Sequence, residues 1–149
     1  MSVDPRSEKN ILTLKPEVQV LARRLIELAK AEGINAKVID GSRTYEQQNK
    51  LYAQGRTKPG RIITKARGGY SWHCFGLAFD VGIFDPSGEH YYEESRAYAE
   101  VGRIGKSLGL EWGGDWEDFQ DEPHFQKNQK GYTLAQIRER HESGQDLFT

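Results

Sequence analysis

Residues 71–80 read SWHCFGLAFD, and they hold the densest group of chemically active side chains in the sequence. His73 precedes an apolar run, and Asp80 stands inside that run. The apolar, aromatic and β-branched character of residues 77–84 predicts a buried strand. A buried carboxylate costs free energy unless a cation or several donors accompany it. Asp80 is therefore predicted to contact either a metal ion or a basic side chain.

A second cluster, residues 121–124, reads DEPH and places a carboxylate three residues before His124. The two clusters together supply two imidazoles and a carboxylate, a ligand set that zinc accepts. Catalytic zinc sites use three protein ligands and leave the fourth position for water. We therefore predict one zinc ion held by His73, Asp80 and His124. The competing interpretations are a salt bridge for Asp80 and an ordinary surface or core location for each histidine.

The second cluster also offers two acids that could act as a general base beside the metal. Bound zinc lowers the pKa of a water molecule towards 7, and a carboxylate can take the proton and return it to a leaving amine. Asp121 is the candidate and Glu122 the competitor. Neighbours in an extended segment point to opposite faces, but spacing alone does not decide which of the two faces the metal.

The composition narrows the class of protein. The 149 residues, 36% of them hydrophobic, fit one domain spanning residues 1–149. The single cysteine, Cys74, excludes an internal disulfide framework, and we expect it to be a small buried residue. A net charge of −1 argues against a nucleic-acid partner. No run reaches the roughly 18 apolar residues of a membrane helix, and the polar residues 1–10 are unlike a signal peptide.

Periodicity and turn residues predict an α+β fold in which helices flank a small antiparallel sheet. Helices are expected over residues 16–32, 44–54, 93–108 and 133–143. Strands are expected over residues 36–40, 77–84 and 123–126. Residues 55–70 hold four glycines and show little periodicity, which predicts a long loop of the kind that is often functional.

Charged and aromatic side chains are unevenly distributed. Residues 55–70 carry five basic side chains and no acid, whereas residues 111–122 carry six acids and no base. We expect the basic loop to border a groove and attract carboxylates, with two solvated faces as the alternative. Trp112 is expected in the core, whereas Trp72 and Trp116 fit either a cleft or the core. The remaining histidines, His90 and His141, are expected at the surface.

The pattern S-x-H-x-x-G-x-A-x-D at residues 71–80, followed by D-x-x-H at residues 121–124, resembles a known family. It is similar to that of the zinc peptidases of the D-alanyl-D-alanine carboxypeptidase superfamily, which are VanY-like. Residues 41–52 look like the upstream arginine segment of this superfamily. Residues 60–84 and 109–116 look like its L-alanyl-D-glutamate endopeptidase branch, which includes many phage endolysins. The resemblance extends over residues 12–126 and, less specifically, over the expected helix at 133–143.

The resemblance implies a fold shared with the hedgehog signalling domain and a role for each site residue. The implied zinc ligands are His73, Asp80 and His124. Asp121 would be the general base, and Arg43 would steady the developing oxyanion unless it simply pairs with an acid. Ser71 and Gln48 would contact the substrate, although Ser71 could instead cap a turn.

The implied function is hydrolysis of the L-alanyl-D-glutamate bond in the stem peptides of peptidoglycan. The alternatives are a D-Ala-D-Ala carboxypeptidase or dipeptidase and, in a different class, a non-catalytic zinc-binding module. The expected biology is that of a bacteriophage endolysin, a monomer that lyses the host cell and so has antimicrobial action. Such an enzyme is expected to stay in the cytoplasm of the producing cell until it is released to the cell wall.

Overall fold

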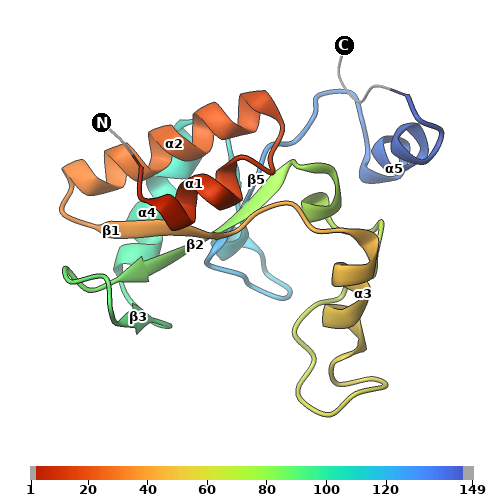
Figure 1. The fold of residues 1–149 in the computed structure, drawn as a ribbon, viewed down its shortest axis with the longest axis horizontal. Coiled ribbons are helices and arrows are strands. Elements are labelled where there is room, and N and C mark those ends of the chain that lie inside the picture. The colour runs from red at the N-terminus through yellow and green to blue at the C-terminus, as the bar shows by residue number, and fades with distance from the viewer. Residues whose placement is uncertain (1–2, 146–149) are drawn as a thin grey trace.

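The computed structural model describes residues 3–145 of the chain, and Figure 1 shows how its elements are arranged. The α-helices of this range are α1 (Pro5–Ile11), α2 (Pro16–Ala31), α3 (Tyr45–Ala53), α4 (Ala97–Ser107) and α5 (Leu134–Glu142). The strands are β1 (Asn35–Asp40), β2 (Ala78–Phe84), β3 (Tyr91–Tyr92), β4 (Glu111–Trp112) and β5 (His124–Gln126). Two short 3₁₀ helices, η1 (Trp72–Phe75) and η2 (Gly113–Asp115), follow the long loop and β4 respectively.

The strands form one antiparallel sheet in the order β1-β2-β5-β4, and β3 pairs with the far end of β2. Because successive side chains of a strand point to opposite faces, Phe79, Val81 and Ile83 of β2 share one face and enter the core. Asp80 points to the other face. The predicted α+β fold with a small antiparallel sheet is confirmed.

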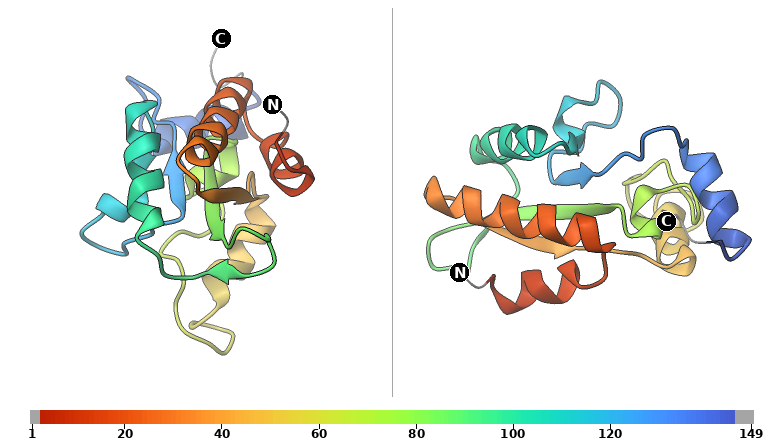
Figure 2. Two further views of the ribbon diagram at one scale, coloured as in Figure 1. Left: turned by 90° about the vertical axis from the view of Figure 1, so that its left-hand side faces the viewer. Right: turned by 90° about the horizontal axis from the view of Figure 1, so that it is seen from above.

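Helices α2 and α4 cover the core side of the sheet. Helix α2 contacts β1, α4 contacts β4, and the two helices contact each other. The two turned views show these helices beside the sheet, with α1 at its edge (Figure 2). The helical spacing of apolar residues in α2 explains its position, since its buried side chains form one stripe: Val18, Ala22, Leu25, Ile26 and Ala29.

Helix α1 protects the free edge of β1. Ser7 Oγ accepts a hydrogen bond from Val38 N at 2.9 Å, and Asn10 Nδ2 donates to Val38 O at 2.8 Å. Both backbone groups would otherwise be open to pairing with another chain. This helix was not predicted from the sequence, although two signals for it are present. Asp4 caps it, and Pro5 stands in its first turn, where the missing N–H of proline loses no hydrogen bond.

Helix α4 begins at Ala97, four residues later than the predicted start at residue 93. The intervening chain is used differently: Tyr91 and Tyr92 form β3, and the hydroxyl of Tyr98 donates to Tyr92 O at 2.6 Å. This tertiary hydrogen bond holds the segment extended against β2. The predicted helices at 16–32, 44–54 and 133–143 agree with α2, α3 and α5 to within a residue or two at each end.

Candidate metal and active site

The sheet register brings two of the predicted ligands together. Asp80 of β2 lies directly opposite His124 of β5 in the antiparallel pairing. Directly paired residues project to the same face of a sheet, so the carboxylate and the imidazole meet on the face away from the core. The spacing along the sequence could not show this, because it depends on which residues of the two strands are paired.

The third predicted ligand, His73, is placed by η1. The side chain of Ser71 caps this short helix by accepting from His73 N at 3.2 Å, and Gly76 ends it in the left-handed region at φ 71°. The carbonyl of His73 accepts from Arg43 N at 2.8 Å. The turn is therefore fixed at both ends and tied to the segment that follows β1.

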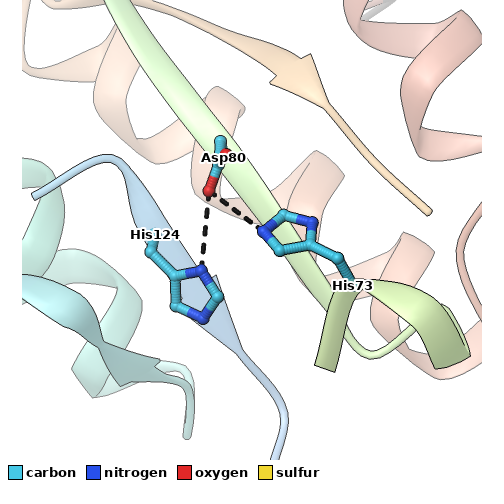
Figure 3. A group of neighbouring side chains, drawn as sticks. All are labelled: His73, Asp80 and His124. Carbon is cyan, nitrogen blue, oxygen red and sulfur yellow. Dashed lines mark ion pairs between the residues drawn. The ribbon is translucent and has the colours of Figure 1, made fainter. Parts of the chain in front are cut away.

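The three side chains converge on one point (Figure 3). His73 Nε2 lies 3.3 Å from Asp80 Oδ1, and His124 Nδ1 lies 3.6 Å from the same oxygen. One potential ligand atom from each residue lies within 4.8 Å of the others. Within the part of the chain that the structure describes, this is the group of histidine, cysteine and acidic side chains whose geometry could hold a metal ion.

The other polar atom of each side chain is held by the protein. His73 Nδ1 lies 2.9 Å from Gly41 O, His124 Nε2 lies 2.8 Å from Gln126 Oε1, and Asp80 Oδ2 accepts from Arg43 at 3.1 Å. Asp80 Oδ1 is buried and has no hydrogen-bond partner among the described residues. A cation between the three side chains would satisfy that oxygen, so the residues present fit a zinc ion.

Titration of the acids follows from this crowding. Burial acts to raise the pKa of Asp80, but the facing imidazoles of His73 and His124 outweigh it and hold the pKa well below its ordinary value. Burial raises the pKa of Asp121, and repulsion from the Asp80 carboxylate raises it further. The two neighbouring acids therefore differ in their affinity for a proton, which is the higher at Asp121.

A cavity of about 500 Å³ opens in front of the three side chains. Asp121 lines it, whereas Glu122 does not. The carbonyl of Glu122 instead accepts from Trp112 Nε1 at 2.7 Å, and this bond turns the segment so that Asp121 faces the cavity. Of the two acids that compete for the role of base, the structure thus places Asp121, and not Glu122, at the cavity.

Arg43 and Ser71 make contacts that fit both of their predicted roles, at the substrate and in the structure. Both side chains line the cavity. Arg43 also pairs with Asp40 at 2.6 Å and with Asp80 at 3.1 Å, and Ser71 also caps η1. Each of the two residues therefore lines the cavity and also stabilises the fold around it.

The predicted substrate contact by Gln48 needs correction. This side chain is fully buried on α3 and does not line the cavity. Its Oε1 accepts from Arg43 at 3.0 Å, and its Nε2 donates to Ala66 O at 2.7 Å. Gln48 therefore lies behind Arg43. Its two hydrogen bonds connect α3 to the long loop and orient the guanidinium of Arg43.

The long loop predicted at 55–70 borders the cavity with part of its length. It extends from the end of α3 in Figure 1, and Ile63, Thr64, Lys65 and Ala66 line the cavity. Lys65 forms an ion pair with Asp118, so the basic loop meets the acidic segment across the cavity. Lys65 is the basic side chain of this loop that lines the cavity, and the other four cations of the loop do not line it.

The remaining aromatic and sulfur-containing residues take distinct places. Trp112 is buried in the core as predicted, and Cys74 is a buried free cysteine as predicted. Trp72 and Trp116 both line the cavity, and the Trp116 ring lies 4.9 Å from the His124 ring between centroids. Gln126 was assigned no role from the sequence, although its side chain holds His124. Its position two residues after His124 in the predicted strand, which places both side chains on one face, was the available signal.

Comparison with known proteins agrees with this site. Residues 64–127, which span all three converging side chains, match the model of a family described as D-alanyl-D-alanine carboxypeptidase. The chain is 40% identical over 121 residues to the peptidoglycan L-alanyl-D-glutamate endopeptidase CwlK of Bacillus subtilis, covering 76% of this chain and 72% of that protein. The chain belongs to this peptidase family.

Further relatives extend the comparison. An L-alanyl-D-glutamate peptidase of Listeria phage A118 is 33% identical over 129 residues, which is 85% of this chain and 42% of the phage protein. The crystal structure of the Serratia marcescens L-Ala D-Glu endopeptidase ChiX superposes with a TM-score of 0.62 at 25% identity, covering 86% of this chain and 90% of that one. Among the described residues, no helix has the length and apolar character needed to cross a membrane.

Proposed function

We propose that this protein is a zinc peptidase that hydrolyses the L-alanyl-D-glutamate bond of peptidoglycan stem peptides. The observation that carries the proposal is the convergence of His73, Asp80 and His124 at the base of a cavity that Asp121 also lines. The bond is proposed from CwlK and the phage peptidase, whose names state it. A single catalytic domain acting as a monomer is part of the proposal.

In this mechanism His73, Asp80 and His124 would hold the zinc ion. Zinc, when bound, supplies Lewis acidity that polarises a carbonyl and acidifies water. The Asp121 carboxylate takes the proton of the attacking water and delivers it to the leaving amine. The Arg43 guanidinium, held by Gln48 and Asp40, stabilises the oxyanion that develops on the scissile carbonyl.

Digestion of purified peptidoglycan followed by mass spectrometry tests the proposed bond. Zinc-loaded protein should leave glycan strands that carry only L-alanine and should release peptides that begin with D-glutamate. Release of a terminal D-alanine instead would show a carboxypeptidase and overturn the proposed bond. Zinc binding without any cleavage would show a non-catalytic zinc-binding module.

We also propose that the enzyme acts in the lysis of bacterial cells. The support is the likeness to a phage peptidase, and the proposed site of action is the cell wall after release from the cell that makes the protein. Purified protein added to cells with permeabilised outer layers should lower the turbidity of the suspension, and the Asp121→Asn variant should not. Equal clearing by both proteins would contradict a lytic role.

A further inference from the structure

A chain of hydrogen bonds leads from His124 Nε2, the ring nitrogen that faces away from Asp80, to the surface of the molecule. His124 Nε2 lies 2.8 Å from Gln126 Oε1, and Gln126 Nε2 donates to Asn128 Oδ1 at 2.8 Å. Asn128 Nδ2 then donates to Glu111 Oε1 at 2.8 Å. The other oxygen of Glu111 accepts from Trp116 Nε1 at 2.8 Å. Because the Trp116 ring packs against the His124 ring, the chain closes on the residue at which it starts.

The direction of every bond in this chain follows from its last member. A carboxylate only accepts hydrogen bonds, so Asn128 must turn its NH₂ group towards Glu111 and its oxygen towards Gln126. Gln126 must in turn direct its NH₂ group at Asn128 and its oxygen at His124. An oxygen facing Nε2 requires a proton on that nitrogen. His124 Nδ1, which faces Asp80 and the candidate metal centre, is then left with its lone pair free.

We propose that Glu111 is a positioning residue which, through Asn128 and Gln126, keeps His124 in the tautomer that binds the metal through Nδ1. The inference rests on the proposed function, since it requires a metal at His124. It assigns Glu111, on β4, a task in a site that its own side chain does not touch. Glu111 belongs to neither of the two clusters of predicted ligands, and it was assigned no role from the sequence.

Burial makes the inner part of the chain effective. His124 and Gln126 are only 6% and 4% exposed, so water cannot replace one partner when the other turns away. Asn128 lies at the surface, and its orientation is set by Glu111. Partners behind a metal-bound histidine fix its tautomer, and their loss commonly weakens metal binding by about 10- to 100-fold.

The substitution Glu111→Gln should reverse the chain. An amide has one accepting and one donating end, and the indole of Trp116 can only donate, so the new amide must accept from Trp116 and donate to Asn128. Asn128 and Gln126 then turn over, and Gln126 presents its NH₂ group to His124. His124 Nε2 would have to accept, which moves the proton to Nδ1, the atom that faces the metal.

A second substitution should undo the reversal. In the double variant Glu111→Gln with Gln126→Glu, the carboxylate stands next to His124 and can only accept. It accepts from His124 Nε2 on one side and from the turned Asn128 on the other, so Nδ1 is again free. A role of Glu111 in general packing gives no reason for a rescue at position 126. An effect of net charge is tested separately by Glu117→Gln, which removes the same charge from an exposed residue outside the chain of hydrogen bonds.

The test is the zinc dissociation constant, measured by competition with a chromophoric chelator. Glu111→Gln should bind zinc about tenfold more weakly than the unsubstituted protein, and the double variant should recover to within about threefold. Glu117→Gln, which removes an exposed acid from the same acidic segment, is the matched control and should bind as the unsubstituted protein does. Thermal unfolding of the zinc-free proteins checks that all four are folded.

The outcomes separate the inference from the proposed function. Failure of the unsubstituted protein to bind zinc would overturn the proposed function and the inference with it. Tight binding by the unsubstituted protein with equal affinity in Glu111→Gln would overturn the inference alone. Weak binding by Glu111→Gln that the Gln126→Glu substitution does not recover would also overturn it, because the direction of the chain would then not be the cause.

Discussion

His73, Asp80 and His124 each direct one polar atom at a shared point and give the other to the protein. This arrangement fixes the orientation of each side chain before a metal arrives, which is the property of a prepared site. Asp80 is the clearest case, since one oxygen bonds Arg43 and the other is buried without a hydrogen-bond donor among the described residues.

The proposed role of Asp121 as general base can be tested by a substitution. The substitution Asp121→Asn keeps the shape of the side chain but removes the proton acceptor, so turnover of peptidoglycan should fall by about 10²- to 10⁴-fold. Zinc content should stay at one ion per chain, because Asp121 is not among the converging ligands.

Glu122→Gln is the matched control for this prediction, since the side chain of Glu122 does not line the cavity. It should retain turnover close to that of the unsubstituted protein. Full activity of Asp121→Asn, or loss of activity in Glu122→Gln, would show that Asp121 is not the general base. Turnover is measured from released muropeptides, and zinc content by elemental analysis.

The corrected position of Gln48 leads to a second prediction. Gln48→Met removes both hydrogen bonds of a fully buried amide, leaving Arg43 and Ala66 O without a partner on that side. Stability should fall by about 1–3 kcal/mol. Because Arg43 would lose its orientation, kcat should fall by about tenfold while KM changes little.

The kinetic constants of Gln48→Met separate the two roles of this residue. A rise in KM at unchanged kcat would restore the original interpretation of Gln48 as a substrate contact. Lys50→Met, an exposed position on the same helix, provides the control and should leave both constants and the stability unchanged.

Helix α4 lies close to the sheet because it carries glycines where it crosses the strands. A Cβ atom on Gly102 would lie 2.4 Å from the Trp112 ring, and one on Gly105 would lie 2.4 Å from the Phe125 ring. Trp112 in turn holds the carbonyl of Glu122, next to Asp121. The packing of this helix thus supports the segment that carries the proposed base.

Gly102→Ala should therefore destabilise the protein by about 1–3 kcal/mol, since overpacking against Trp112 outweighs the better helix propensity of alanine. At an exposed helical position alanine is preferred over glycine by about 1 kcal/mol. The reverse exchange at exposed Ala99 of the same helix, Ala99→Gly, should accordingly also destabilise. Denaturant unfolding measures both, and a Gly102→Ala variant more stable than the original would contradict the close contact.

The long, periodic elements could be predicted from the sequence, and the two-residue strands could not. Helix α2 has a full apolar stripe, and β2 has an apolar run that only Asp80 interrupts, so both were recognisable. Strands β3 and β4 have two residues each and exist because neighbouring strands offer them hydrogen bonds. A pairing of that kind leaves no periodicity in the sequence.

The candidate site divides in the same way. His73, Asp80, His124 and Asp121 follow from residue type and motif, whereas the atoms that hold them do not. The partner of His73 is the backbone carbonyl of Gly41, and any residue can supply a carbonyl. Gly41 and His73 are 32 residues apart in the sequence, and only the tertiary fold brings them into contact.

For the whole molecule, the near-zero net charge conceals opposed charges at the cavity, where Lys65 of the basic loop meets Asp118 of the acidic segment. Attraction between the basic loop and acidic stem peptides should assist binding. Replacing three loop cations with glutamine should lower kcat/KM several-fold at low ionic strength, and the difference should shrink at high salt, where charges are screened over about 10 Å or less. The replaced residues are Lys58, Arg61 and Lys65.

A charge-matched control places the same three losses far from the cavity. Helices α1 and α2 carry exposed cations that do not line it: Lys9, Arg24 and Lys30. Their replacement should leave kcat/KM nearly unchanged at every salt concentration. An equal effect of both triple variants would trace the salt dependence to net charge and not to the basic loop.

We infer that His73, Asp80 and His124 bind one zinc ion and leave a position open towards the cavity. Diffraction at the zinc absorption edge, from crystals grown with one equivalent of zinc, is the decisive measurement. One anomalous peak is expected within about 2.0–2.2 Å of His73 Nε2, Asp80 Oδ1 and His124 Nδ1, with no fourth protein ligand. A peak at other side chains, or a site closed by a fourth protein ligand, would contradict it.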